Sequence, residues 1–190
     1  WNKLFSVPHV AIGYEVRVTP LQVLRAMNVY ATEGTLVRFH IVKESDGKPT
    51  ARAAGPDPKI VDPEIASELV HRVLEKVVDE GTGKDGRLEG YSIAGKTGTA
   101  QVLDPVTKTY TTKKYIASFV GFVPVERPAL TMVVVLADPK EGIYYGGQVC
   151  APVFRDIAKQ ALPYLHVPPD RPQEVVAAAA RKKNGKDIKS

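Results

Sequence analysis

The segment of residues 93–101, Ile-Ala-Gly-Lys-Thr-Gly-Thr-Ala-Gln, restricts the possible folds of this chain more than any other part of its 190 residues. It combines glycines with β-branched threonines, and Asp104-Pro105 follows shortly after it. In a helix interior, glycine costs about 1 kcal/mol and proline about 3 kcal/mol relative to alanine. A helix of useful length therefore cannot begin at Lys96. With few bulky side chains, residues 93–102 instead predict an edge strand whose backbone a ligand can approach closely.

A nucleotide-binding P-loop is the main competing interpretation of this segment. The pattern G-x-x-x-x-G-K-[ST] is matched formally by Gly90, Gly95, Lys96 and Thr97. Residues 132–138, an apolar run that ends in aspartate, even resemble a strand that supplies a magnesium-binding carboxylate. The context is unfavourable, because a P-loop needs a buried strand before it and a helix N-terminus at its lysine. Residues 81–87 are polar and glycine-rich. A P-loop nucleotide-binding protein therefore remains only an alternative.

The remaining sequence predicts helices separated by strands. Thr19-Pro20 begins a helix that Gly34 ends, and Asp62-Pro63 begins another that Gly81 ends. Residues 1–18 predict a loop running into an extended segment, residues 36–43 a short strand, and residues 44–58 a hairpin or irregular connection. The last segments are strands at 91–102, 115–124 and 129–137, and a helix at 151–165.

The order of these elements defines the expected fold class. A short turn at residues 126–128 joins the last two strands, which implies antiparallel pairing. Helix, strand, helix, three strands and helix together predict an α+β fold, in which helices flank an antiparallel sheet. We expect one domain over residues 1–168, followed by a tail at 169–190 that is proline-rich, then basic, and disordered.

Composition excludes several kinds of partner. The net charge of +5 is concentrated in the tail, where six basic and three acidic residues follow Pro169. No stripe of basic and aromatic residues occurs elsewhere, so nucleic acid is not an expected partner. The single cysteine, Cys150, lies in an apolar stretch and predicts a small buried side chain. The four histidines are scattered, and neither a metal nor another cofactor is expected.

Residues 95–101, Gly-Lys-Thr-Gly-Thr-Ala-Gln, resemble the third conserved motif, Lys-Thr-Gly, of penicillin-binding transpeptidases. Further segments resemble the same family in the same order, and the resemblance covers residues 8–168. These segments are Ile12-Gly13-Tyr14-Glu15 with residues 18–22, residues 118–124, Tyr144-Tyr145-Gly146-Gly147, and residues 151–154. The family usually has a small residue where Cys150 stands. The matches favour class B members of the division type.

The resemblance implies a C-terminal part of a serine-transpeptidase or β-lactamase-like fold. Family members cross-link peptidoglycan stem peptides through an acyl-serine intermediate and react with β-lactam antibiotics. The implied location is the periplasmic, or extracytoplasmic, face of the bacterial inner membrane, with an anchor upstream of Trp1. Cell-division or elongation proteins are the implied partners. A sensor or β-lactamase-like protein would share the Lys-Thr-Gly motif, but the matches at residues 18–22 and 151–154 disfavour it.

The resemblance also assigns roles to individual residues. Lys96 is expected to attract the substrate carboxylate and to assist proton transfer, and Thr97 and Thr99 to offer hydroxyl groups to the same carboxylate. Gly98 would let the substrate lie along the strand, and the Thr99 N–H would be one oxyanion donor. Tyr144, Tyr145 and Gly146 are candidates for the rim of the cleft. Lys96 and Thr99 are thus the catalytic candidates, and residues 96–99 the substrate-binding ones.

Two further motifs of the family, Ser-x-x-Lys with the nucleophile and base and Ser-x-Asn, are expected upstream of this chain. Ser-x-Asn does not occur in the sequence. The Ser-x-x-Lys spacing occurs once, at Ser45-Asp46-Gly47-Lys48, within the predicted hairpin or irregular connection of residues 44–58 and after the first segments that resemble the family's later part. We therefore expect the chain to be inactive alone and to need the N-terminal half of the same transpeptidase domain as its partner. A non-catalytic structural module of the same fold is the remaining alternative.

Overall fold

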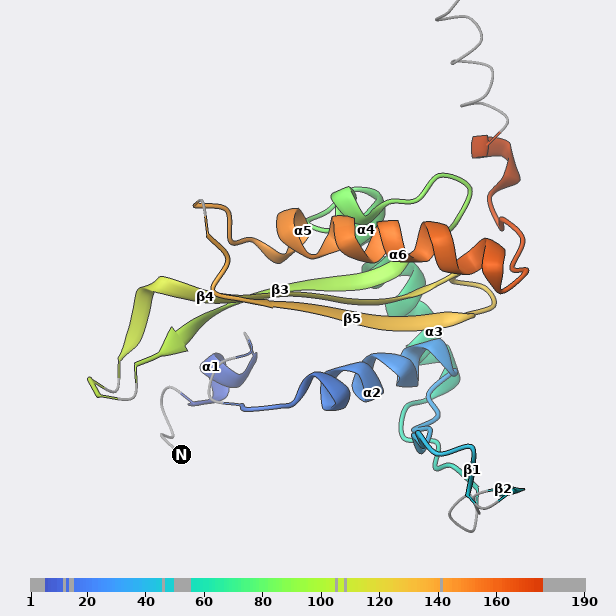
Figure 1. Cartoon of the computed structure of the whole chain (residues 1–190), viewed down its shortest axis with the longest axis horizontal. Helices are drawn as coiled ribbons and strands as arrows, with labels where there is room; N and C mark the ends of the chain where they lie inside the picture. Colours follow the sequence, from blue (N-terminus) through green and yellow to red (C-terminus); the bar gives the residue numbers. More distant parts are fainter. Residues whose placement is uncertain are drawn as a thin grey trace, which may run out of the picture.

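A three-stranded antiparallel sheet forms the centre of the structure, which is a computed structural model (Figure 1). The described residues are 6–11, 13, 16–45, 47–49, 56–104, 106–107, 109–140 and 142–175. The strands lie in the order β3-β4-β5, and their bounds are Ala94–Leu103, Tyr110–Val123 and Leu130–Ala137. Helices cover both faces, so the predicted α+β fold is confirmed. All three strands were predicted, although β4 begins at Tyr110 rather than at residue 115.

The register of the sheet places the 93–101 segment at an edge. Lys96 lies opposite Val120 and Gly98 lies opposite Ser118, while Ser118 lies opposite Val135 of β5. Within the described residues, β3 therefore has a partner strand on one side only, as the sequence predicted. The pairing becomes irregular between Gln101 and Leu103, beyond the motif.

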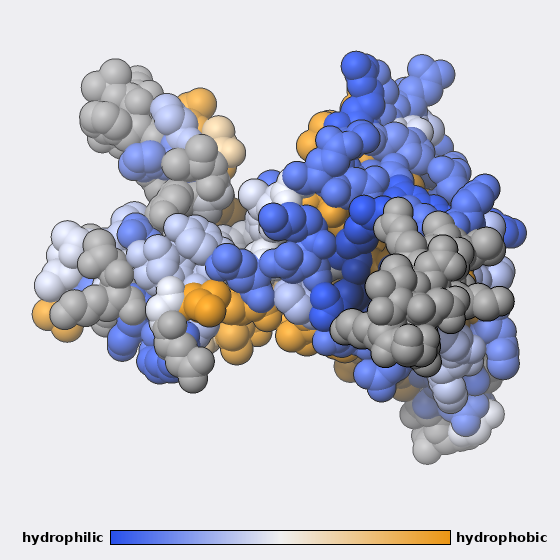
Figure 2. Space-filling model, turned by 90° about the horizontal axis from the view of Figure 1, so that it is seen from above, coloured by the Kyte–Doolittle hydropathy of each residue, from blue (hydrophilic) through white to orange (hydrophobic). Residues whose placement is uncertain are grey.

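One face of the sheet is covered by α5 (Gly146–Val149) and α6 (Ala151–Tyr164). Phe119 of β4 and Phe154 of α6 meet edge to face, with ring centroids 5.0 Å apart at 75°. Cys150 is fully buried in the same cluster, as predicted, and burial raises the pKa of its thiol. Figure 2 looks onto this side of the molecule, where the outer surface of the helices is mainly hydrophilic. No described helix is long and apolar enough to span a membrane.

The opposite face is covered by α2 (Pro20–Ala31). Thr19 caps this helix as predicted, because its hydroxyl accepts from the Gln22 N–H at 3.2 Å and its own N–H donates to Gln22 Oε1 at 2.7 Å. Gly34, at φ +88°, donates its N–H to the Val29 carbonyl at 2.8 Å and ends the helix. Met27 packs with Ala94, Val120 and Phe122 beneath it.

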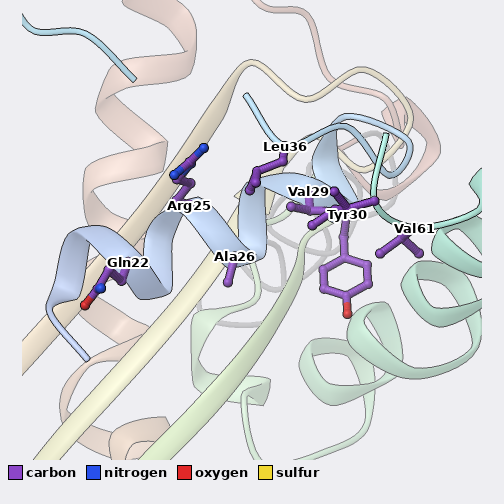
Figure 3. Close-up of a pocket in the computed structure, with 8 residues that line it drawn as sticks. Gln22, Arg25, Ala26, Val29, Tyr30, Leu36 and Val61 are labelled. Atoms are coloured by element: carbon purple, nitrogen blue, oxygen red, sulfur yellow. The ribbon is translucent and has the colours of Figure 1, made fainter. Parts of the chain in front are cut away.

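A surface pocket of about 360 Å³ lies beside α2 (Figure 3). Figure 3 shows Gln22 and Arg25 on one side of it and Tyr30 with Val61 on the other. A second pocket, of about 380 Å³, lies on α2 between Phe39 and Pro128. Both pockets lie on the α2 side of the sheet, and none of the residues of the 93–101 segment lines either of them.

The predicted helix between Asp62 and Gly81 is confirmed, with an irregular centre. It consists of α3 (Pro63–Leu69), a π-helical segment (Val70–Leu74) and α4 (Glu75–Asp79). Asp62 caps its start by accepting from the Glu64 N–H at 2.8 Å. Val70 belongs to the cluster under α2, whereas Val78 belongs to the cluster under α6. The helix therefore crosses the edge of the sheet and joins the two layers.

Two predictions near the N-terminus were wrong. Residues 36–43 do not form a strand. The nearest pairing before them is a single bridge between Thr35 and Lys59. The two-residue strands β1 (Glu44–Ser45) and β2 (Lys48–Pro49) follow them. Ile41 is 98% exposed, so the alternating apolar residues of this segment do not form a buried face. Residues 6–11 form a helix, α1 (Ser6–Ala11), where a loop was predicted. Its proline lies in the first turn, where a helix tolerates it.

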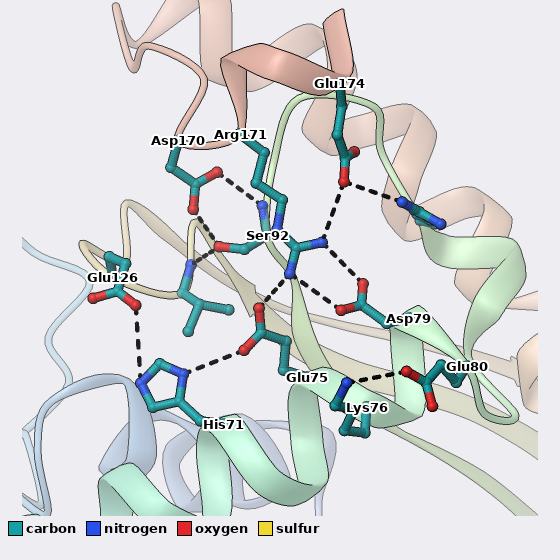
Figure 4. Close-up of polar contacts among 12 residues, drawn as sticks. His71, Glu75, Lys76, Asp79, Glu80, Ser92, Glu126, Asp170, Arg171 and Glu174 are labelled. Atoms are coloured by element: carbon teal, nitrogen blue, oxygen red, sulfur yellow. Dashed lines mark hydrogen bonds and ion pairs between the residues drawn. The ribbon is translucent and has the colours of Figure 1, made fainter. Parts of the chain in front are cut away.

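The chain remains tied to the domain beyond Pro168-Pro169 (Figure 4). Asp170 accepts from the Ser92 N–H at 2.8 Å and also bonds to the Ser92 hydroxyl, which in turn accepts from the Val125 N–H at 2.9 Å. Arg171 binds Asp79 with two bonds of 3.0 and 3.1 Å and also contacts Glu75. The predicted end of the folded part at residue 168 is thus too early. Residues 176–190 lie outside the described residues.

The Arg171 ion pair predicts a measurable contribution to stability. Asp79, through its hydrogen bonds, raises the pKa of the Arg171 guanidinium, whose side chain is 24% exposed. Arg171→Leu would leave two acidic side chains of α4 without this partner. We expect the free energy of unfolding to fall by about 1–3 kcal/mol. Urea unfolding of a protein that contains the complete domain would measure the change.

Arg72→Leu is the matched control for this experiment. Arg72 pairs with Glu68 at 2.7 Å on the same helix, but the two side chains are 76% and 67% exposed. We expect it to change stability by less than about 0.5 kcal/mol. Equal effects of the two substitutions would contradict a stabilising role for Arg171.

Candidate active site

The Lys-Thr-Gly segment places its side chains on both faces of the edge strand β3. Thr97 lies opposite Phe119, which belongs to the cluster under α6, whereas Lys96 lies opposite Val120, which belongs to the cluster under α2. Because side chains alternate along a strand, Thr97 and Thr99 share the α6 side and Lys96 lies on the α2 side. The Lys96 side chain is exposed and bends back over its own strand, so that its ammonium donates to the Thr97 carbonyl at 2.8 Å.

This bond indicates which backbone groups face the open edge of the sheet. In an antiparallel pair, alternate residues direct both N–H and C=O groups toward the partner strand, and those between them direct both away. The Thr97 carbonyl accepts from the Lys96 side chain, and we infer from this bond that it is one of the outward groups. On that basis the N–H of Thr99, two residues along, is expected to point to the same open edge. Lys96 and these backbone groups are therefore brought together at one place.

Gly98 lies directly against the Ser118 side chain on β4. A Cβ atom on Gly98 would lie 2.5 Å from the Ser118 hydroxyl oxygen, which is much closer than non-bonded atoms approach. The absence of a side chain thus makes room for Ser118. This reason comes in addition to the predicted one, that glycine keeps the strand surface flat for a substrate.

The start of α5 lies directly against the motif. The Gly146 N–H donates to the Thr99 hydroxyl at 3.1 Å. A Cβ atom on Gly146 would lie 2.1 Å from the Ser118 carbonyl oxygen and 2.5 Å from that of Gly98. Gly146 was predicted at the rim of the cleft, but in the structure it is buried beside the motif and holds one of its hydroxyl groups.

Thr82 is a contact residue that sequence reasoning missed. Its hydroxyl lies 2.8 Å from the Thr97 hydroxyl, and it comes from the loop that follows α4. A Cβ atom on Gly147 would lie 1.9 Å from the Thr82 carbonyl oxygen, so α5 closes over this residue. Its position between two glycines, Gly81 and Gly83, was the available signal, but glycines also mark ordinary loops.

Tyr144 and Tyr145 belong to an aromatic group that continues beyond the motif. Tyr144 stacks on Tyr115 with ring centroids 4.0 Å apart at 9°, and Tyr145 is tilted against it at 4.6 Å. Tyr115 was not predicted, because it pairs with Gln101 only through the register of β4. Tyr145 is 55% exposed, which suits a surface that borders the motif. The hydrogen bond that Tyr144 donates to Tyr145, followed by the charge of Tyr145, raises the pKa of Tyr144 to about 12.

The contact between Tyr144 and Tyr145 predicts that Tyr144 loses its proton at an unusually high pH. Loss of the Tyr144 proton removes its hydrogen bond to Tyr145, so the protonated form is favoured to about pH 12. In a Tyr145→Phe variant, we expect the pKa of Tyr144 to return toward its ordinary value of 10.0. Carbon-13 NMR of labelled tyrosine rings would follow the titration, with Tyr164→Phe as the control. A pKa that stays at about 12 in Tyr145→Phe would contradict the assigned cause.

The P-loop alternative has no structural support at this position. Lys96 lies within β3, which continues to Leu103, rather than at the N-terminus of a helix. The helix dipole and free N–H groups that hold a phosphate are therefore missing at Lys96.

Comparison with known proteins gives the same assignment as the motif. A family model described as penicillin binding protein transpeptidase domain matches residues 4–159. The chain is 36% identical over 167 residues to the stage V sporulation protein D of Bacillus subtilis, covering 86% of this chain and 26% of that protein. It is 35% identical over 160 residues to the peptidoglycan D,D-transpeptidase FtsI of Escherichia coli K12, covering 84% and 26%. The chain thus spans about a quarter of the length of these relatives.

Solved structures extend the likeness to the fold. The transpeptidase domain of penicillin-binding protein 3 from Burkholderia pseudomallei, in its apo form, is 36% identical, with a TM-score of 0.72, and the match covers 85% of this chain and 46% of that chain. Penicillin-binding protein 3 from Mycobacterium tuberculosis, complexed with ampicillin, is 28% identical with a TM-score of 0.75, covering 86% and 38%. The predicted partial serine-transpeptidase fold is confirmed. The chain belongs to the family of penicillin-binding protein transpeptidase domains.

Proposed function

We propose that this chain is the C-terminal part of a class B, division-type peptidoglycan D,D-transpeptidase. The observation that carries the proposal is the arrangement at the open edge of β3. There, the Lys96 ammonium lies 2.8 Å from the Thr97 carbonyl, and the Gly146 N–H donates to the Thr99 hydroxyl at 3.1 Å. One cation, two hydroxyl groups and outward backbone N–H groups suit a ligand that carries a carboxylate and is extended like a strand.

The proposed reaction begins on a serine in the N-terminal half of the domain. The serine oxygen attacks the carbonyl carbon between the two terminal D-alanines of a stem peptide, the C–N bond breaks, and the leaving amine takes the serine proton. An amine of a neighbouring stem then attacks the ester, which restores the serine and forms the cross-link. In this scheme Thr99 donates its N–H to the developing oxyanion, and Lys96 attracts the terminal carboxylate. A β-lactam would acylate the same serine.

The missing half of the domain is the proposed partner. The chain has no Ser-x-Asn sequence, and its one Ser-x-x-Lys spacing joins the two-residue strands β1 and β2, with Ser45 at the end of β1 and Lys48 at the start of β2. We propose that the catalytic Ser-x-x-Lys and Ser-x-Asn motifs lie in the N-terminal half, so we expect this chain to be inactive alone. Leu136 of β5 and Leu21 of α2 are large apolar side chains on the exposed surface of the described part. We propose that the N-terminal half adds strands beside β5, which is an edge strand of the described sheet, and covers exposed apolar side chains such as these.

The proposed setting follows from the substrate. Stem peptides are cross-linked outside the cytoplasm, so we propose that the complete protein acts at the extracytoplasmic face of the inner membrane, anchored by an upstream segment. Proteins of cell division or elongation would be its partners there.

Covalent labelling tests the proposal directly. The full-length protein is incubated with a fluorescent penicillin, and the labelled peptide is identified by mass spectrometry. We expect one labelled serine, upstream of residue 1, followed three residues later by lysine. A folded protein that is not labelled and forms no cross-links from stem peptides would contradict the proposal and favour a non-catalytic module.

A further inference from the structure

Thr82 occupies a position that the end of α4 fixes tightly. The Gly81 N–H donates to the Lys76 carbonyl at 3.0 Å, and the Gly83 N–H donates to the Val77 carbonyl at 2.8 Å. Gly83 is buried, and a Cβ atom there would lie 3.0 Å from the Phe119 ring. The backbone on both sides of Thr82 is therefore held by the last turn of a helix and by the core.

The second constraint on Thr82 comes from α5. The Thr82 carbonyl oxygen lies so close to Gly147 that a Cβ atom there would approach it to 1.9 Å. The same Cβ atom would lie 3.4 Å from the Thr97 side chain. Thr82, Thr97 and Gly147 thus meet at one point, although they come from a loop, a strand and a helix. The Thr82 side chain is consequently directed at Thr97, where the two hydroxyl oxygens lie 2.8 Å apart.

The role of the contact between Thr82 and Thr97 depends on which of the two hydroxyl groups donates its proton. A threonine hydroxyl has one proton to donate and two lone pairs that accept, whereas an ionised carboxylate only accepts. A hydroxyl serves a carboxylate only if its proton is not used elsewhere. Thr99 meets this condition, because it accepts from the Gly146 N–H and a backbone N–H cannot accept. Thr97 meets it only if Thr82 is the donor in the bond between them.

We propose that Thr82 is a positioning residue, whose hydroxyl donates to the Thr97 oxygen so that Thr97 donates its own proton to the carboxylate of the ligand. This inference rests on the proposed function, and it gives the two motif threonines equivalent roles. Each accepts one hydrogen bond from behind, Thr97 from Thr82 and Thr99 from the Gly146 N–H. Each then presents a proton toward the open edge of β3. Thr82 itself does not touch the ligand.

A carboxylate-dependent rate comparison tests this role. In the full-length protein, the second-order rate constant for acylation is measured with a penicillin and with its methyl ester, which lacks the charged carboxylate. We expect Thr82→Val, which keeps the shape but removes the hydroxyl, to lower the rate constant for the acid about tenfold and to leave that for the ester unchanged. Thr82→Ser, which restores a hydroxyl, is expected to recover most of the rate.

The control is another pair of threonines whose hydroxyl oxygens lie at the same distance from each other. The hydroxyls of Thr107 and Thr109 also lie 2.8 Å apart on an exposed connection, so Thr109→Val should leave both rates unchanged. An equal loss with acid and ester would show a general structural defect and overturn the inference. A Thr82→Val variant with the wild-type ratio would overturn it while the proposed function stands. A wild-type protein that neither probe acylates would overturn the proposed function and this inference with it.

Discussion

Replacing Lys96 by alanine is expected to lower the acylation rate constant of the full-length protein by a penicillin about 10²–10³-fold, which is the range for removal of a catalytic proton-transfer or charge-stabilising group. The ammonium is the cation held at the open edge of β3, where it donates to the Thr97 carbonyl. Its loss removes the attraction for the carboxylate and the charge that favours serine ionisation. Stopped-flow measurement of acylation with a chromogenic β-lactam would give the rate constant.

Two control variants locate this effect. Lys159→Ala removes an equivalent positive charge from the exposed side of α6, so it should leave the rate within about twofold, because surface charges at a distance are screened by salt. Lys96→Arg keeps the charge but changes its shape, and we expect an intermediate rate. If Lys96→Ala acylated as fast as Lys159→Ala, Lys96 would have no role in the reaction.

The second large effect is expected at Phe119. Phe119→Ala should lower the free energy of unfolding by about 3–5 kcal/mol, the usual range for truncating a buried phenylalanine. Phe119 is fully buried, packs edge to face against Phe154, and lies opposite Thr97 in the sheet. Its ring would also touch Cβ atoms built on Gly95 and Gly83, so it supports the motif strand and the Thr82 loop together.

Chemical unfolding of the complete domain would measure this change. Tyr164→Ala is the control, since this aromatic side chain at the end of α6 is 83% exposed and should cost less than about 0.5 kcal/mol. A loss below about 1 kcal/mol for Phe119→Ala would mean that the Phe119 site is not packed as described. Because Phe119 supports two parts of the site, a folded fraction of the variant should also acylate more slowly than the wild type.

Local sequence signals predicted the regular elements well. Thr19-Pro20 and Asp62-Pro63 begin helices because a side-chain oxygen and a proline within the first turn act over one helical turn. Residues 93–102 predict a strand because their glycines and threonines are unfavourable in a helix. The same signals failed at residues 36–43, where alternation was present but no neighbouring strand was available to form a ladder within the described residues. Strand formation depends on a partner that can lie anywhere in the chain, so local pattern alone does not decide it.

By itself, the sequence determined the family, the edge strand and the motif residues, because these are properties of contiguous residues and of their order along the chain. Only the tertiary structure decided which groups support the motif. The Thr82 hydroxyl reaches Thr97 across 15 residues, the Gly146 N–H reaches Thr99 across 47, and Asp170 reaches Ser92 across 78. Such contacts form where packed layers bring separate elements to one point. Their directions are fixed by helix ends and glycine contacts that no local pattern specifies.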